Sequence, residues 1–444
     1  MGLERSGDVV PAGRASQPGN GEEPAGAVKP FGIAKRVVWE AYRQVKANRG
    51  AAGIDGETLQ MFEANLKSNL YRVWNRMSSG CYFPPAIRLV EIPKKNGGTR
   101  ALGISTVEDR IAQTVAKFYI EPALERLFHP DSYGYRPGKS ALQALGVTRE
   151  RCWKYGWVIE FDIHKAFDEL DWTLLMRAVR KHIKERWAVL YIERWLKVPF
   201  MRADGMAVTR SKGVPQGSVV GPVLMNLFMH YCFDRWMQKK HPYCPFARYA
   251  DDAVVHCSSE KQAQWLLAAI GKRLEECGLR LNLEKSAIVY CKSSRRREAY
   301  ARKHFTFLGY TFRPRGAMDR CGKLFESFLP AVSQEAIKKM RRTIRSWKLP
   351  RQTPASIGEL ADRYNPILRG WLNYYGHFYK SALYRVFRHF DAALARWVRR
   401  KYRTLRRHIG RSLWWIWRVA RRQPGLFTHW RAFGQAGGRA MGAV

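Results

Sequence analysis

Two adjacent aspartates interrupt an apolar segment in the middle of the chain. Residues 246–257, FARYADDAVVHC, have the pattern of two short β-strands joined at Asp251 and Asp252. Aspartate is common in turns, so a solvated hairpin turn would explain both residues without any further role. An unpaired carboxylate in an apolar segment is unfavourable, however, unless hydrogen bonds or a cation compensate its charge. The segment therefore predicts a hairpin and leaves open whether its turn is a functional site.

A second strand-like segment also ends in a carboxylate. Residues 157–172, WVIEFDIHKAFDELDW, are apolar up to Asp162 and then become polar and acidic, as at the start of a helix. Two such strands side by side would bring Asp162, Asp251 and Asp252 together. Clustered carboxylates repel one another unless a cation lies among them, and hard oxygen ligands suit Mg²⁺. The pattern therefore predicts a site for two Mg²⁺ ions, about 4 Å apart, that would promote phosphoryl transfer.

The charge of the chain indicates a polyanionic partner. Its formal net charge is +41 over 444 residues, which favours nucleic acid over an anionic membrane. Residues 331–444 contain 25 Lys and Arg against 4 Asp and Glu, so this last quarter carries +21 of the total. We therefore expect the C-terminal part of the chain to bind nucleic acid.

Membrane insertion, export and zinc binding are not expected. The sequence has no run of 18 apolar residues, and its N-terminus lacks the apolar core of a signal peptide. Its eight cysteines include no C-x-x-C pair, which argues against a zinc site and favours a reduced, cytoplasmic protein.

The segment GYRPGKS, residues 134–140, superficially resembles a phosphate-binding loop. A P-loop has four residues between its glycines, whereas this segment has three. Pro137 also lacks the backbone N–H that a phosphate cradle uses. A P-loop is therefore not expected here.

Several segments, in a fixed order, resemble the sequence blocks of reverse transcriptases. They are FDIHKAFD, GVPQGSVVGPVLMNLF, YADD, GLRLNLEKS and FLGYTF. Three more, IPKKNGGTRALGISTVEDRIAQ, SYGYRPGKSALQAL and RYNPILRGWLNYYGHF, are similar to group II intron-encoded reverse transcriptases, also called maturases. Retrons and diversity-generating reverse transcriptases share the first set but not the RGWLNYYG segment. The resemblance covers residues 35–405 approximately.

The resemblance implies an α+β fold of the right-hand polymerase kind, with fingers, palm and thumb. The palm would be an antiparallel sheet, and the thumb would be helical and basic, with Trp371, Tyr374 and Tyr375 packed between its helices. The expected divisions are a disordered tail (1–30), an N-terminal extension and fingers (31–157), the palm (158–313), a connection and thumb or maturase domain (314–405), and a basic nucleic-acid-binding region (406–444).

The resemblance also implies roles for single residues. Asp162, Asp251 and Asp252 would be the catalytic, metal-binding carboxylates. Phe167 would exclude a ribose 2′-OH, and the incoming nucleotide would be contacted by Lys94, Arg100, Phe167, Gln216 and Lys285. The cations of WVRRKYRTLRRH would repel one another unless phosphates neutralised them. We therefore expect RNA to be bound by Arg399, Arg400, Lys401, Arg403, Arg406 and Arg407.

We therefore expect an RNA-directed DNA polymerase that uses two Mg²⁺ ions and binds group II intron RNA to assist splicing and mobility. Its partners would be this RNA, an RNA template with a DNA primer, target DNA and deoxynucleoside triphosphates, in a bacterial cytoplasmic ribonucleoprotein without a membrane. The sequence has no cysteine after Cys321, which argues against the zinc-associated endonuclease of many relatives.

Two alternatives remain open. The chain could be a domesticated or CRISPR-associated reverse transcriptase that acts in repair or defence. It could also be an RNA-binding splicing cofactor whose polymerase site is vestigial, although the presence of Asp162, Asp251, Asp252, Phe167 and Gln216 argues against this. The DNA that flanks the gene would show whether an intron surrounds it.

Overall fold

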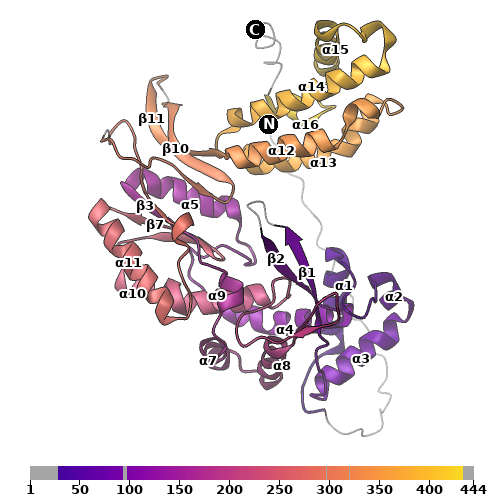
Figure 1. The fold of residues 1–444 in the computed structure, drawn as a ribbon, viewed down its shortest axis with the longest axis vertical. Helices are drawn as coiled ribbons and strands as arrows, with labels where there is room; N and C mark the ends of the chain where they lie inside the picture. The colour runs from indigo at the N-terminus through magenta and orange to yellow at the C-terminus, as the bar shows by residue number, and fades with distance from the viewer. Residues whose placement is uncertain (1–28, 94–97, 297, 320, 434–444) are drawn as a thin grey trace, which may run out of the picture.

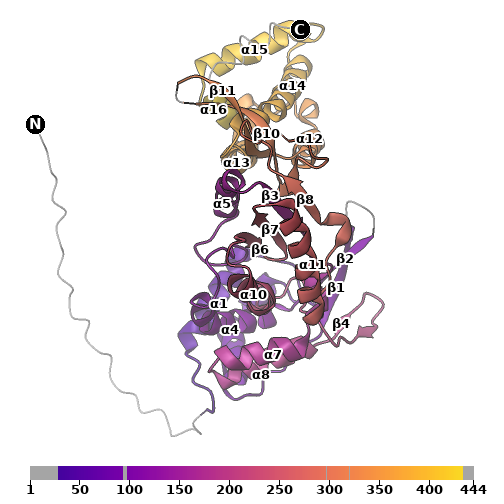
Figure 2. The ribbon, with the colours of Figure 1, turned by 90° about the vertical axis from the view of Figure 1, so that its left-hand side faces the viewer.

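The computed structural model describes residues 29–93, 98–296, 298–319 and 321–433. Residues 1–28 of the predicted tail lie outside these ranges. The predicted nucleotide contact Lys94 and residues 434–444 of the predicted C-terminal region also lie outside them. Figures 1 and 2 show an elongated molecule in which helices α12 to α16 form one end and the N-terminal helices lie toward the other.

The N-terminal part combines a helical cluster with a β-hairpin. In chain order its elements are α1 (Lys35–Asn48), α2 (Leu59–Ala64), α3 (Leu66–Ser78), β1 (Ile87–Pro93), β2 (Thr99–Ile104), α4 (Val107–Glu125) and α5 (Ala141–Lys154). Strands β1 and β2 pair antiparallel, with Ile92 opposite Arg100. Helix α4 begins where the Thr106 side chain accepts a hydrogen bond from the backbone of Asp109 (3.1 Å). This helix is buried along most of its length and supports the elements around it.

The central part contains the sheet that carries the aspartates. Its elements are β3 (Trp157–Phe161), α6 (Ala166–Glu169), α7 (Trp172–His182), α8 (Arg186–Lys197), β4 (Phe200–Met201), β5 (Ala207–Val208), α9 (Gly221–Met229), the π-helical turn η1 (His230–Asp234), α10 (Arg235–Lys240), β6 (Phe246–Tyr249), β7 (Asp252–Cys257), α11 (Glu260–Glu276), η2 (Leu283–Lys285) and β8 (Ala287–Tyr290).

Four of these strands form an antiparallel sheet in the order β6-β7-β3-β8. Alternate side chains point to opposite faces of a strand, and both faces of β3 are buried. Ile159 and Phe161 pack into the large core with α9 and α11, whereas Val158 packs into a separate cluster with residues of α5. The apolar runs that precede Asp162 and follow Asp251 therefore belong to the central strands β3 and β7, and the run that precedes Asp251 belongs to the edge strand β6, which is also buried on both faces.

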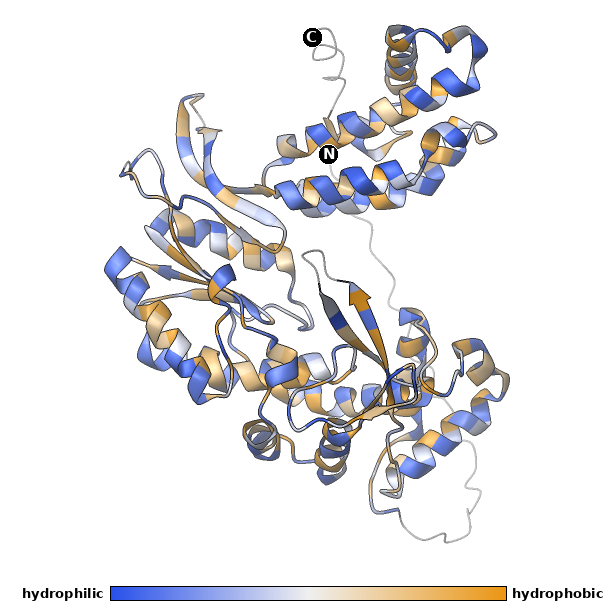
Figure 3. Ribbon diagram, in the orientation of Figure 1, coloured by the Kyte–Doolittle hydropathy of each residue, from blue (hydrophilic) through white to orange (hydrophobic). Residues whose placement is uncertain are grey.

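The C-terminal part is a β-ribbon followed by a helical bundle. Its elements are β9 (Phe305–Phe307), β10 (Tyr310–Met318), β11 (Leu324–Val332), α12 (Gln334–Ser346), η3 (Leu349–Arg351), α13 (Ile357–Tyr375), η4 (Lys380–Leu383), α14 (Tyr384–Lys401), η5 (Arg403–Leu405), α15 (Ile409–Arg422) and α16 (Thr428–Phe433). Helices α12 to α14 alternate hydrophobic and hydrophilic positions along their length (Figure 3) and enclose their own core.

The aromatic residues of α13 divide between two neighbours. Trp371 stacks on Trp347 at the end of α12, with ring centroids 5.8 Å apart, as expected for packing between helices. Tyr374 and Tyr375 instead pack against Tyr310 of β10, at 5.7 and 5.6 Å. The expectation was wrong for Tyr374, because the end of α13 lies against the β-ribbon, whereas Tyr375 also packs against the core of the helical bundle. In the described part of the chain, no helix has the length and apolarity needed to cross a bilayer.

Candidate active site

Strand register brings the three aspartates together. Asp162 directly follows β3, and Phe161 pairs with Ala253 of β7, so Asp162 stands opposite Asp252. Tyr249 pairs with Asp252, which leaves Ala250 and Asp251 as a two-residue hairpin turn. Ala250 has φ +59°, a left-handed conformation that is uncommon for a residue other than glycine and is often found at functional sites.

The carboxylates of Asp162, Asp251 and Asp252 lie close together, and their negative charge is only partly neutralised by neighbouring groups. Desolvation, followed by the charges of Asp251 and Asp162, raises the pKa of Asp252 to about 7, although the residue as a whole is exposed. Desolvation also raises the pKa of Asp251, and the charge of Asp162 adds to this effect. Lys285 donates to Asp162 at 2.8 Å, and Asn282 donates to the same oxygen at 3.1 Å. A divalent cation would relieve the repulsion that remains.

The donor set fits Mg²⁺ as a partial site. Among the described residues, no group of three or more His, Cys, Asp or Glu side chains forms a ready-made metal cage. Polymerases do not need such a cage, because Mg²⁺ keeps several waters and binds through one or two carboxylates together with substrate phosphates. Asp162, Asp251 and Asp252 can supply the protein's share of this coordination.

Three of the predicted nucleotide contacts, Arg100, Phe167 and Gln216, also lie close together. The Arg100 guanidinium on β2 donates to the Gln216 side chain, which in turn donates to both carboxylate oxygens of Asp168 (3.3 and 3.4 Å). Phe167 is the neighbour of Asp168 on α6, and its carbonyl accepts from the backbone of Val214 (2.7 Å). Arg100, Phe167 and Gln216 therefore lie around one loop, residues 213–217.

Two glycines allow the loop of residues 213–217 to lie directly against β2 and α6. Gly217 has φ +111°, and a Cβ there would lie 2.4 Å from the carbonyl oxygen of Gly103 on β2. Gly213 has φ +82°, and its Cβ would lie 2.4 Å from the carbonyl oxygen of Asp168. Larger residues would push the loop away from β2 on one side and from α6 on the other.

Gln113 holds the residues that directly follow this loop, and it was not predicted from the sequence. Its side-chain oxygen accepts from the Ser218 hydroxyl (2.9 Å) and the Val219 backbone (2.8 Å), while its amide donates to Asp109 (2.8 Å). Asp109 and Gln113 are four residues apart on α4 and fully buried. A polar pair at helical spacing within a buried helix is the sequence signal that could have identified them.

Comparison with known proteins shows the family of this chain. Residues 92–312 match the family described as reverse transcriptase (RNA-dependent DNA polymerase), and residues 337–424 match the group II intron, maturase-specific domain. Protein YkfC of Escherichia coli (strain K12) is 30% identical over 317 residues, which are 61% of this chain and 78% of YkfC. The chain belongs to the group II intron-encoded reverse transcriptases. The expected family, the α+β right-hand fold and the polymerase class are thereby confirmed.

Two further proteins illustrate the range of the similarity. Group II intron-encoded protein LtrA of Lactococcus lactis subsp. cremoris is 24% identical over 424 residues, covering 77% of this reverse transcriptase and 68% of LtrA. A solved telomerase from Candida albicans superposes with a TM-score of 0.43 and 10% sequence identity, covering 85% of this chain and 68% of the telomerase.

The predicted RNA-binding cations of the reverse transcriptase fall into two classes. Arg400, Arg403, Arg406 and Arg407 are exposed. Half-buried Arg399 donates to the carbonyl of Arg406 at 3.2 Å. The Lys401 ammonium donates to the carbonyls of residues 353 and 355, at 3.0 and 2.6 Å, so it stabilises the end of α14. The five arginines therefore remain the better candidates for phosphate contacts.

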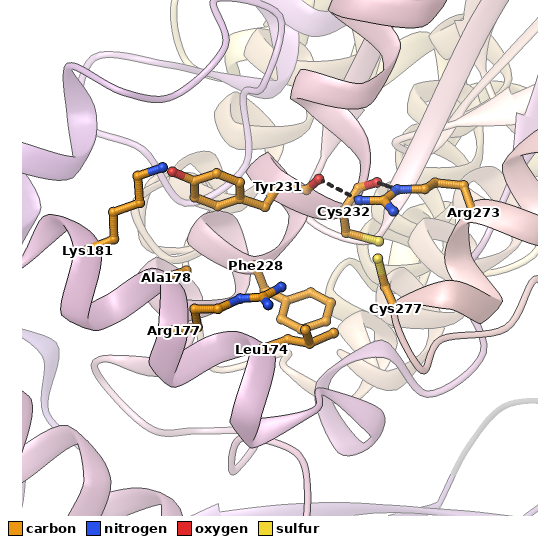
Figure 4. Close-up of a pocket in the computed structure, with 9 residues that line it drawn as sticks. All are labelled: Leu174, Arg177, Ala178, Lys181, Phe228, Tyr231, Cys232, Arg273 and Cys277. Atoms are coloured by element: carbon orange, nitrogen blue, oxygen red, sulfur yellow. Dashed lines mark hydrogen bonds between the residues drawn. The ribbon is translucent and has the colours of Figure 1, made fainter.

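A separate cavity lies between α7, α9, η1 and α11. It has a volume of about 290 Å³, and none of the predicted site residues lines it. Figure 4 shows Arg273 of α11 donating to the carbonyls of Tyr231 and Cys232, at 3.2 and 3.0 Å, with the Cys232 and Cys277 sulfurs facing each other. The Arg273 guanidinium at this cavity is therefore engaged by backbone carbonyls, and the cavity is separate from the group of predicted site residues.

Proposed function

We propose that Asp162, Asp251 and Asp252 hold two Mg²⁺ ions with which this reverse transcriptase extends a DNA primer on an RNA template. The observation that carries the proposal is the β3–β7 register, which puts Asp162 opposite Asp252 at the ends of two buried strands. When bound, the ions would activate the attacking hydroxyl and stabilise the leaving oxygen. The protein's own share is to hold these carboxylates in a fixed arrangement.

The nucleotide would be bound between β2, α6 and the loop of residues 213–217. Arg100 presents a forked guanidinium suited to a triphosphate, and binding would exchange its contact with Gln216 for phosphate oxygens. The side-chain oxygen of Gln216 would then be free to contact the nucleotide. Lys94, which follows β1 in the sequence, would supply a second cation, and Lys285 would approach from the side of Asp162.

We further propose that the partners are an RNA template with its DNA primer, deoxynucleoside triphosphates, group II intron RNA and target DNA. The match to the maturase-specific domain, the similarity to LtrA and the +21 charge of residues 331–444 support RNA as the main partner. A ribonucleoprotein in the bacterial cytoplasm is the setting we propose.

The metal requirement is tested by primer extension on an RNA template. We expect extension with Mg²⁺, complete loss after chelation with EDTA, and recovery when Mg²⁺ is restored in excess. Circular dichroism of the chelated protein should remain unchanged, because backbone pairing and the buried core hold the strands that carry the carboxylates. Extension that continues in EDTA would contradict the metal assignment.

Sugar selection is tested at Phe167. The ring is half-buried and packs against the central core, at the start of the short helix α6. Phe167→Val should remove bulk beneath the sugar and raise ribonucleotide incorporation relative to deoxyribonucleotide incorporation by at least about 10-fold, an effect of about 1.4 kcal/mol. The measurement is kcat/KM for each dNTP and its rNTP. An unchanged ratio with a lower melting temperature would show that Phe167 only packs the core.

A further inference from the structure

One arginine beneath the aspartate turn is completely enclosed. Arg248 of β6 and Asp234 of η1 have no exposed side-chain surface, and their closest charged atoms are 2.6 Å apart. Nε and one terminal nitrogen of Arg248 donate to the two carboxylate oxygens of Asp234, at 2.8 and 2.6 Å. This is a bidentate pair, the strongest geometry available to these two groups.

The other donors of Arg248 reach the segments around the turn. They contact the Asn226 side chain (3.1 Å), the carbonyl of Ala250 (2.9 Å) and the Ser132 hydroxyl (2.8 Å). A guanidinium has five N–H donors, and here all five are used. Ala250 is the residue with the unusual φ of +59°, next to Asp251. Arg248 therefore binds the backbone of the turn itself.

The segment SYGYRPG supports the turn from the other side. Ser132 pairs with Arg248 as a parallel β-bridge, and the backbone of Tyr133 donates to the Arg248 carbonyl (2.8 Å). The next residue, Gly134, approaches so closely that a Cβ there would lie 2.5 Å from the Ala250 nitrogen. The Asn226 amide, which also accepts from Arg248, donates to the Gly134 carbonyl at 2.8 Å.

We propose that Arg248, held by Asp234, is a positioning residue for polymerisation that fixes the Ala250–Asp252 turn against Gly134. The inference rests on the proposed role of Asp251 and Asp252 as metal ligands, and it assigns a role to the segment that superficially resembled a P-loop. The π-helical turn η1 contributes by directing Asp234 toward Arg248, and such turns frequently occur at functional sites.

A purely stabilising ion pair would behave differently. Replacing both members of a buried pair by apolar residues is often neutral for stability, whereas removing one member leaves an uncompensated buried charge. An apolar pair can restore the packing, but it cannot donate to Ala250, Asn226 and Ser132. A variant in which both members are apolar should therefore recover stability but not the catalytic rate.

The test compares Arg248→Met, Arg248→Met/Asp234→Leu and Arg248→Lys by thermal melting and single-turnover primer extension. The single Arg248→Met variant should melt at a clearly lower temperature, and the double variant should recover most of this loss. Both should extend at least about 100-fold more slowly, because a misplacement of about 1 Å can reduce the rate this much. The affinity for template–primer should stay unchanged, so the loss falls on kcat.

Arg248→Lys keeps the charge beside Asp234 but has only three donors on a single nitrogen. It should fold, and it should remain at least about 10-fold slower than the wild type because the turn is then less well supported. Val73→Ala, at a buried position in α3, is the control that lowers stability without touching the turn. A double variant that melts like the wild type and extends at the wild-type rate would overturn the proposal.

Gly134→Ala tests the same turn without altering any charge. Gly134 does not have a left-handed φ, and the three atoms nearest to an added Cβ belong to Ala250 and to Tyr249, at the start of the turn, so alanine would press on the turn's backbone. Extension should slow by at least about 10-fold through displacement of the turn. Gly146→Ala in α5, where the nearest atom lies 4.0 Å from the added Cβ, is the matched control and should keep full activity. Full activity of Gly134→Ala would also overturn the proposal.

The same assays separate this inference from the proposed function. If Asp251→Asn extends normally, the metal assignment fails, whatever the Arg248 variants do. If Asp251→Asn is inactive while the folded double variant and Gly134→Ala extend at the wild-type rate, the metal assignment stands and only the positioning role is refuted.

Discussion

Asp251→Asn should lower Mg²⁺-dependent primer extension on RNA by at least about 10³-fold, or about 4 kcal/mol of transition-state stabilisation. The substitution removes one anionic metal ligand and leaves a side chain of nearly the same shape. Asp251 lies in the turn between β6 and β7, so the loss should not come from unfolding. The expected pattern is a normal melting temperature, normal template–primer binding and a very slow chemical step.

A carboxylate in a different turn provides the control. Asp204 lies between β4 and β5, where its side chain accepts a hydrogen bond from the backbone of Met206 (2.9 Å). Asp204→Asn keeps this acceptor oxygen and makes the same chemical change away from the carboxylate cluster, so its extension rate should equal that of the wild type. Normal extension by folded Asp251→Asn would contradict the metal assignment.

Neutralising the C-terminal arginines should weaken binding of intron RNA and flatten its dependence on salt. The variant replaces Arg399, Arg400, Arg403, Arg406 and Arg407 with glutamine. The slope of log K against log salt should fall by about 0.7–0.9 for each phosphate that the protein no longer neutralises, and affinity near physiological salt should fall by about 10²-fold or more if several phosphates are affected. The measurement is RNA binding over a series of salt concentrations.

Lys401 provides an informative comparison within the same segment. Lys401→Met removes a positive charge whose ammonium is hydrogen-bonded to the carbonyls of Thr353 and Ala355. It should lower the melting temperature and leave the salt slope nearly unchanged, because this cation serves the fold. An unchanged slope in the five-arginine variant would show that those arginines are only a solvated surface.

Loss of polymerisation should leave RNA binding and splicing intact. An Asp251→Asn/Asp252→Asn protein should still bind intron RNA and promote splicing, because its basic C-terminal helices are intact. Splicing is assayed on the RNA transcribed from the native locus. If this protein binds RNA but fails to splice it, polymerisation and splicing share the carboxylate site.

The sequence by itself determined the family and enzyme class of this protein and the positions of its candidate carboxylates in the chain. A strand buried on both faces appears as an apolar run, so Asp162, Asp251 and Asp252 are visible as carboxylates at strand ends. The order of the blocks was sufficient for the family and the fold class, which the comparisons confirm. The charge excess of residues 331–444 is likewise a property of composition alone.

Only the tertiary structure decided which distant residues support these groups. Periodicity reports that a residue is buried, but it does not name the segment that covers it. Arg248 makes its contacts with Ser132, Asn226 and Asp234, up to 116 positions away, and its neighbours in the sequence do not reveal these partners. Lys401 shows the opposite. It lies in a basic run that predicts an RNA contact, but its ammonium donates hydrogen bonds to backbone carbonyls of the protein. Hydrogen bonds are directional and short, so their partners are settled by the packing of whole elements rather than by sequence pattern.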